Sequence, residues 1–404
     1  MESTMALSRR NFVKAAGVGG IGALATPLIA ARGSEALSAA WAEPGFYPGA
    51  VLDSAVEERV GYRSRFATAI RLDSNENPNG PGRAALEAVR AMFTEANRYP
   101  DGQEGDLQAA VAKHQKVGEN NVLMACGSGE ILRSACYAFT GPGKSLVTAS
   151  PSFETPVGFA ESMGAQVHKV PVDKDLRLDL QQMLDKVQGA GLVFFCNPNN
   201  PTATVHGASV VKDFIAQVNR RNPDCMIMMD EAYHEYVEDP NYATSIPISL
   251  DNPKVFTVRT FSKVFGMAGL RAGYAIGRPE ALRPMGRHKL SSGVNVLASA
   301  AGIATLPDQA HITTEITVNR EAKAYTVKAL ESMGFKASAS QANFIMVPVG
   351  RDTRAFKDAC AKQGILVGRP FPPLTTHSRI SIGTMDEMKK AVEVFKSVLG
   401  NAAN

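Results

Sequence analysis

The stretch TFSKVFGMAGLRAGY, Thr260 to Tyr274, places a lysine among groups that suit a phosphate. Lys263 follows the hydroxyls of Thr260 and Ser262 and precedes Arg271 by eight positions. A lysine amine can condense with an aldehyde to form a Schiff base. Two hydroxyls and a bidentate guanidinium suit a phosphate dianion. The stretch therefore indicates an aldehyde that carries a phosphate, namely pyridoxal 5′-phosphate (PLP), although a solvated surface lysine is the alternative when this stretch is taken alone.

An asparagine follows the apolar run Gly191 to Phe195, which predicts a buried parallel strand. The segment CNPNNPT then ends the strand, because Asn and Pro favour turns. Asn197 at that point can donate to a phenolate oxygen of a cofactor. An ordinary Asn-Pro turn is the alternative.

A carboxylate ends a second predicted strand, in MIMMDEAYHEY. Asp230 follows the apolar residues directly, and the carboxyl end of a parallel strand faces the crevice where ligands bind in open α/β sheets. Paired with a pyridine nitrogen, Asp230 would keep that nitrogen protonated, so that the ring can accept electrons. Tyr233 can donate to the same phenolate oxygen as Asn197. As an alternative, Asp230 caps a helix.

A glycine-rich turn, Gly127 to Glu130, follows the predicted strand Val122 to Ala125 and opens a helix. Such a turn presents backbone N–H groups and the positive end of a helix to an anion. We expect Ser128, Gly129 and Glu130 to bind the cofactor here.

Taken together and in order, these motifs resemble those of fold-type I PLP-dependent aminotransferases, and more narrowly the histidinol-phosphate aminotransferase group. The resemblance covers about residues 70 to 400. The matching segments are LDSNENPNGP (72–81), NRYPDGQ (97–103), SPSFETP (150–156), CNPNNPT (196–202), DEAYHEY (230–236), TFSKVFGMAGLRAGY (260–274), GVNVLASAA (293–301), QANFIMV (341–347) and SRISIGT (378–384).

The resemblance implies roles for further residues. Phe153 stands where the family stacks an aromatic ring on the cofactor, and Tyr99 where a tyrosine of the neighbouring subunit reaches the cofactor phosphate, which implies a homodimer. Arg379 matches the arginine that grips the substrate α-carboxylate. Asn75 and Arg369 are the other implied substrate-binding residues, Arg369 for a phosphate or second anion.

Short apolar runs alternate with helical stretches from about residue 97 to 309, which predicts an α/β fold with a mostly parallel seven-stranded sheet. The expected strands are 122–125, 145–149, 165–170, 191–195, 226–230, 254–258 and 272–277. Residues 310–404 predict a small α+β domain, to which part of the segment 43–96 is added; the rest of that segment is an arm.

The first 42 residues predict a twin-arginine signal peptide. SRRNFVK (8–14) precedes a weakly apolar stretch rich in Ala and Gly, and Ala40 to Ala42 offers a small-x-small cleavage site. We expect the protein to reach the periplasm through the twin-arginine machinery. A retained membrane anchor and a plain N-terminal extension are alternatives. GVGGIG (17–22) matches a dinucleotide fingerprint only formally, because no strand precedes it.

Charge and cysteines add little to this interpretation. The 404-residue chain carries 43 Lys and Arg against 39 Asp and Glu; the leader holds four of the basic and two of the acidic residues, so the remainder carries +2. Such a balance does not indicate nucleic acid as a partner. The five cysteines show no metal-ligand spacing, and we expect no metal.

These observations predict a PLP-dependent aminotransferase that moves an amino group between an amino acid and a 2-oxo acid. The donor is expected to be aromatic or similar to histidinol phosphate. Two alternatives stay open: another PLP enzyme on the same scaffold (a decarboxylase, lyase, racemase or oxidase), or a non-catalytic exported PLP-binding protein.

Overall fold

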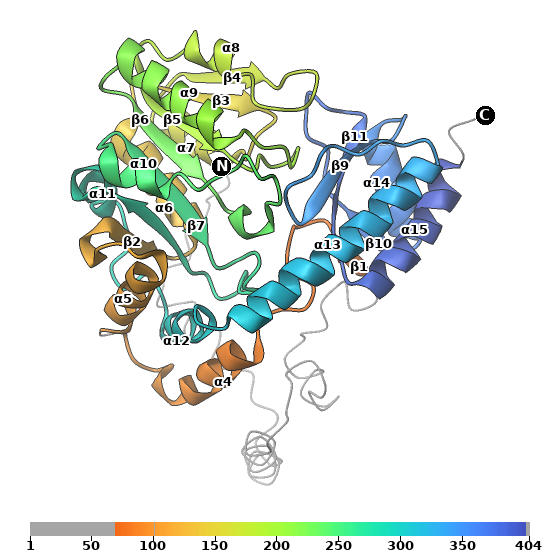
Figure 1. Cartoon of the computed structure of the whole chain (residues 1–404), viewed down its shortest axis with the longest axis horizontal. Coiled ribbons are helices and arrows are strands. Elements are labelled where there is room, and N and C mark those ends of the chain that lie inside the picture. The colour runs from red at the N-terminus through yellow and green to blue at the C-terminus, as the bar shows by residue number, and fades with distance from the viewer. Residues whose placement is uncertain (1–68, 101, 401–404) are drawn as a thin grey trace, which may run out of the picture. The chain divides into compact units, whose positions relative to one another are not determined.

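The computed structural model describes residues 69–100 and 102–400, and Figure 1 shows their arrangement. The predicted signal peptide and most of the predicted arm therefore lie outside the described residues. Among the described ones, no helix is long and apolar enough to cross a membrane. No group of three His, Cys, Asp or Glu side chains there could hold a metal ion. The five cysteines are free thiols.

A seven-stranded sheet forms the centre of the larger part of the fold (Figure 1). Its order is β2-β8-β7-β6-β5-β3-β4, and only β8 runs antiparallel to its neighbours. The strands are β2 (Val122–Ala125), β3 (Ser145–Ser150), β4 (Val167–Pro171), β5 (Ala190–Cys196), β6 (Met226–Asp230), β7 (Val255–Thr260) and β8 (Gly273–Gly277). The predicted fold class, with its mostly parallel seven-stranded sheet, is confirmed.

Both faces of this sheet are covered because the central strands are apolar throughout. Alternate residues of a strand point to opposite faces: Leu192 and Phe194 join one buried cluster, while Val193 and Phe195 join another. The helices on the first face are α6 (Ser128–Phe139), α7 (Thr155–Ser162) and α11 (Pro279–Gly286); those on the second are α8 (Leu180–Leu184), α9 (Ala208–Arg221) and α10 (Ile246–Asp251).

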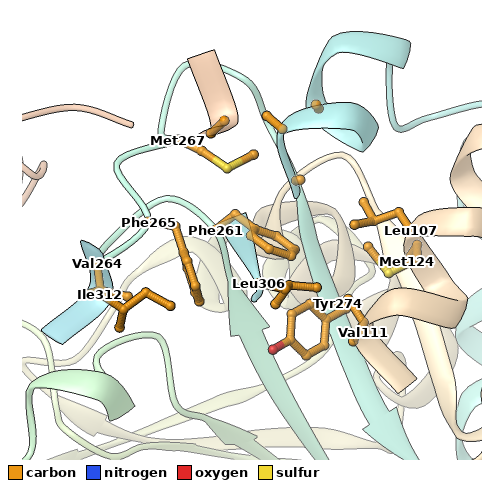
Figure 2. Close-up of a cluster of buried hydrophobic side chains, with 14 of the residues drawn as sticks. Leu107, Val111, Met124, Phe261, Val264, Phe265, Met267, Tyr274, Leu306 and Ile312 are labelled. Carbon is orange, nitrogen blue, oxygen red and sulfur yellow. The ribbon is translucent and has the colours of Figure 1, made fainter. Parts of the chain in front are cut away.

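A third cluster packs beside the edge of the sheet that holds β2 and β8 (Figure 2). Leu107 and Val111 of α5 (Gln103–Gln115) lie near Met124 and Tyr274, with Phe261 alongside. Helix α12 (Val296–Thr305) packs against both α5 and α4 (Arg83–Ala91). Short 3-10 helices η1 (Phe93–Glu95), η2 (Glu119–Asn121) and η3 (His234–Tyr236) complete this part.

The smaller part has its own core and two small sheets. Strand β1 (Ile70–Leu72) runs parallel to β10 (Ile365–Val367), and β9 (Phe344–Pro348) runs antiparallel to β11 (His377–Ser381). Helices α13 (Gln309–Ser332), α14 (Thr353–Lys362) and α15 (Met385–Leu399) pack against them, and Thr384 begins α15 with a capping box to Glu387. The expected segment 43–96 is thus divided: β1 joins the small part, whereas α4 packs on α12 because its buried Ala85 belongs to the third cluster.

Candidate active site

A cavity of about 720 Å³ lies where the carboxyl ends of the central strands meet the small part. Polar side chains that follow β5, β6 and β7 reach it, as the rule for open α/β sheets predicts. Twelve of the predicted site residues line it: Asn75, Ser128, Gly129, Phe153, Asp230, Tyr233, Thr260, Ser262, Lys263, Arg271, Arg369 and Arg379.

Lys263 lines this cavity, and its amine lies over the ring of Tyr233. Its Nζ donates to the backbone oxygen of Asn75 at 3.1 Å and lies 5.3 Å from the ring centroid of Tyr233. Burial, and then the charge of Arg379, lower the pKa of Lys263 to about 8. A fraction of the amine is therefore neutral and nucleophilic near pH 7.

Asp230 is the last residue of β6 and lies opposite Cys196 of β5. The carboxylate is buried and accepts a hydrogen bond from the Ala232 N–H at 3.2 Å. Burial raises the pKa of Asp230 to about 6, while the Ala232 N–H and the charge of Lys263 act in the opposite direction. A cationic ring nitrogen placed beside it would hold the carboxylate in its ionised form.

One end of the cavity has the groups that a phosphate needs. Ser128 and Gly129, at the amino end of α6, line the cavity together with Thr260 and Ser262. The hydroxyl of Thr260 donates to that of Ser262 at 2.9 Å. Arg271 completes this end with its guanidinium. A Cβ at Gly127 would lie 2.4 Å from Arg271 Nη2, so only glycine leaves the guanidinium its place.

The side walls carry an aromatic ring and a phenol. Phe153 lines the cavity with 37% of its surface exposed, and Tyr233 is buried. The phenol oxygen of Tyr233 accepts from Asn75 Nδ2 at 3.2 Å, so its own hydrogen is available to a bound oxygen. Burial raises the pKa of Tyr233, which keeps that hydrogen in place.

Two arginines come from the small part. Arg379, on β11, is buried and donates to Asn200 Oδ1 at 2.9 Å and to the backbone oxygen of Asp73 at 2.5 Å, while its Nε has no partner among the described residues. Arg369 is half exposed and pairs with Glu154 at 2.5 Å. The ring of Phe371 lies between them, 4.8 Å from the Arg379 guanidinium and 4.3 Å from that of Arg369.

Two residues predicted to contact the cofactor, Asn197 and Glu130, do not line the cavity. The amide of Asn197 is bonded to the backbone of His206, at 3.1 and 2.9 Å, and does not line the cavity. The carboxylate of Glu130 accepts from the N–H groups of Cys126 and Leu290, both at 2.7 Å, and also stays outside. These side chains fix turns around the cavity rather than its wall.

Asn200, and not Asn197, is the asparagine of this loop that lies on the cavity wall. It lines the cavity and touches Arg379, and the third asparagine of CNPNNPT is the signal that could have identified it. Tyr99 is 81% exposed and does not line this cavity, so its predicted contact with a neighbouring subunit stays a prediction. Glu76, Glu154, Cys196 and Lys357 also line the cavity and were not singled out from the sequence.

The residues present fit PLP: a lysine amine, a buried carboxylate, a stacking ring and a phosphate cradle that any Cβ at Gly127 would obstruct. Fold and site therefore define a PLP-dependent enzyme of fold type I. The model of the family "Aminotransferase class I and II" matches residues 67–395. The chain belongs to this family.

Individual relatives narrow the activity. A histidinol-phosphate aminotransferase of Symbiobacterium thermophilum is 37% identical over 82% of this chain and 91% of its own length. An aromatic amino acid aminotransferase of Thermobifida fusca is 34% identical over 78% and 87%. The crystal structure of histidinol-phosphate aminotransferase from Sinorhizobium meliloti in complex with PLP is similar with a TM-score of 0.76, at 27% identity over 88% of this chain and 99% of that one. This protein is a PLP-dependent aminotransferase.

Proposed function

We propose that this aminotransferase moves an amino group between an amino acid with an aromatic or imidazole side chain and a 2-oxo acid. The observation that carries the proposal is Arg379. It is a buried guanidinium on the cavity wall, and it forms no ion pair with a carboxylate of the described residues. A planar fork with an unpartnered Nε is suited to a planar α-carboxylate.

The chain's own residues divide the remaining work. PLP, when bound, supplies an electron-accepting ring next to the substrate Cα. Asp230 would hold the proton of the ring nitrogen, and Tyr233 and Asn200 would face the ring oxygen. Lys263, whose pKa is about 8, would take the proton from the substrate Cα and deliver it to C4′ of the cofactor, as a base with a pKa near the working pH does best.

A second donor, histidinol phosphate, is favoured by one observation. Arg369 lines the cavity and half of its side chain is exposed, so a second anion can reach it. The names of several relatives point the same way, because they are called histidinol-phosphate aminotransferases. Histidinol phosphate has a phosphate and no carboxylate, so the two donors make different demands on Arg379.

The test compares phenylalanine, tyrosine, histidine and histidinol phosphate as donors to 2-oxoglutarate, in the wild type and in Arg379→Ala. Loss of a buried charged fork is worth about 2–5 kcal/mol, so kcat/KM for the amino acids should fall roughly 30- to several-thousand-fold. PLP affinity, measured by titration, should barely change. The proposal fails if Arg379→Ala spares every amino acid.

We propose that Lys263 is the residue to which PLP attaches covalently. Borohydride reduction of the wild type should leave a stable mass addition on the peptide that contains Lys263, and Lys263→Ala should lose it. Circular dichroism should show the same fold in both proteins. A reduction-stable addition on another lysine in the wild type would contradict the assignment.

We propose that the folded protein is exported to the periplasm by the twin-arginine route. The support is the sequence SRRNFVK followed by an Ala- and Gly-rich stretch. Replacing Arg9 and Arg10 with lysine should keep the precursor in the cytoplasm. Unchanged export of that variant would contradict the proposal.

We also propose that two copies form a homodimer in which Tyr99 of each subunit completes the cavity of the other. The support is the high exposure of this tyrosine and its absence from the cavity lining of its own chain.

A further inference from the structure

A lysine outside the known motifs reaches the active-site cavity. Lys357 lies in the middle of α14, is half-buried and lines the cavity together with Val367, Arg369 and Phe371 of the small part. Within residues 69–100 and 102–400 it forms no ion pair. A partly buried ammonium without a counterion favours an anionic ligand.

The neighbouring arginine already has a carboxylate. Arg369 follows β10 in the small part, whereas Glu154 comes just before α7 in the large part, so their ion pair bridges the two sides of the cavity. Both side chains are about half exposed, at 50% and 54%. An exposed pair of this kind is worth at most about 1 kcal/mol, so a competing anion can replace Glu154 at little cost.

The two cationic sites of the cavity differ in burial and in net charge. Arg379 is buried and bonded to Asn200, where it suits an α-carboxylate. Lys357, Arg369 and Glu154 together carry one net positive charge at the more exposed side. A substrate with a single carboxylate would use only Arg379.

We propose that Lys357 is a further cation of the second-anion subsite already assigned to Arg369, and that Glu154 occupies Arg369 until this anion replaces it. The inference rests on the proposed role of Arg379. The matching ligands are oxo acids or amines that carry a terminal carboxylate or phosphate monoester. Lys357 is then a specificity-determining residue for the known reaction.

The first experiment measures binding to the holoenzyme, with glutarate as a two-carboxylate probe and butyrate as its one-carboxylate counterpart. Lys357→Met should weaken glutarate binding roughly 5- to 30-fold, because it removes one charge-assisted contact worth about 1–2 kcal/mol. Butyrate binding should stay within about twofold, and Lys357→Arg should restore most of the loss. Lys362→Met, on an exposed position of the same helix, is the matched control.

The second experiment measures kcat/KM. With 2-oxoglutarate and phenylpyruvate as acceptors, Lys357→Met should reduce use of 2-oxoglutarate by a similar factor and spare phenylpyruvate. Histidinol phosphate compared with histidinol tests the phosphate in the same way. Glu154→Gln should change binding in the opposite direction, with glutarate and histidinol phosphate bound about two- to fivefold more tightly.

The outcomes separate the two proposals. Equal effects of Lys357→Met on glutarate and butyrate, or no effect on either, would overturn the subsite. An unchanged glutarate affinity in Glu154→Gln would overturn the competition. If instead Arg379→Ala leaves butyrate and every amino acid unaffected, the α-carboxylate role itself is wrong.

Discussion

At the scale of single residues, burial brings the two central ionisable groups closer in pKa. Asp230 rises to about 6 and Lys263 falls to about 8, in both cases chiefly because burial penalises the charged form. Each shift is a cost to the folded cofactor-free protein when the group is charged. The two shifts together favour a ligand whose cation pairs with the Asp230 carboxylate and whose aldehyde condenses with the Lys263 amine.

The shift of Asp230 predicts a pH dependence of stability in the cofactor-free protein. The native state keeps a proton on Asp230 between about pH 4 and 6, whereas the unfolded chain releases it, so the free energy of unfolding falls as pH rises through this window. Asp230→Asn keeps the hydrogen bond acceptor for Ala232 and lacks the charge. We expect it to be more stable than the wild type above pH 6, by on the order of 2–3 kcal/mol.

Denaturant unfolding between pH 4 and 7 measures this difference. The two proteins should converge near pH 4, and Asp358→Asn, at an exposed position of α14, should follow the wild type. A constant gap across the whole range would show that Asp230 does not titrate as expected.

At the scale of elements, the ends of β6 and β7 are joined by a buried ion cluster. Arg259 of β7 lies 2.7 Å from Glu231 and 3.4 Å from Glu235, and only 3% of its side chain is exposed. Thr244 also accepts from Arg259 at 2.9 Å. The cluster lies directly beside Asp230 in the chain, so it holds the strand end that carries this carboxylate.

Removing the arginine should leave two acidic side chains without their counterion. Arg259→Met is expected to reduce the free energy of unfolding by about 3–5 kcal/mol, because a broken buried pair leaves an uncompensated charge. Arg320→Met, which breaks an exposed pair with Glu238, should cost less than about 1 kcal/mol. The double variant Arg259→Met with Glu231→Gln should be less destabilised than Arg259→Met alone; an equal or larger loss would argue against the electrostatic explanation.

Some elements of the fold could be predicted from the sequence, and others could not. β5 and β6 are fully buried, so each is an unbroken apolar run with a polar residue at its end or directly after it. Both strands and the position of Asp230 could therefore be predicted. Within CNPNNPT, three asparagines have the same chemistry, and only the path of the loop decides that Asn200 and not Asn197 faces the cavity. Lys357 could not be predicted, because a lysine on an amphipathic helix is indistinguishable in sequence from a solvated one.

At the scale of the whole molecule, the active site draws on segments that are far apart in sequence. Asn75, Lys263 and Arg379 come from three such segments, and Lys263 donates to the backbone of Asn75. Helix α13 begins at the third cluster, which holds Ile312, and ends in the core of the smaller part, which holds Leu330 (Figure 1). The boundary at residue 309, inferred from the change in pattern, stays a prediction, and a helix shared by two cores has no signature in the sequence.

We expect the active-site cavity to be completed by a residue of a second chain. Tyr99 resembles a cofactor-binding tyrosine, yet 81% of it is exposed and it is absent from the lining of its own cavity. We therefore expect it to act in the cavity of a second subunit. Tyr99→Phe should weaken PLP binding roughly 10- to 100-fold, as expected for a lost hydrogen bond to a charged group of about 1.5–3 kcal/mol.

Mixing two defective proteins tests the shared site directly. Lys263→Ala subunits lack the amine, and Tyr99→Phe subunits lack the phenol, but a mixed dimer has one cavity with both native groups. After subunit exchange at limiting PLP, activity should rise above the sum of the two separate proteins, and sedimentation should show a dimer. A mixture that gives only the sum although exchange has occurred would place Tyr99 outside the partner's site, and a fully active monomer at high dilution would exclude the shared cavity altogether.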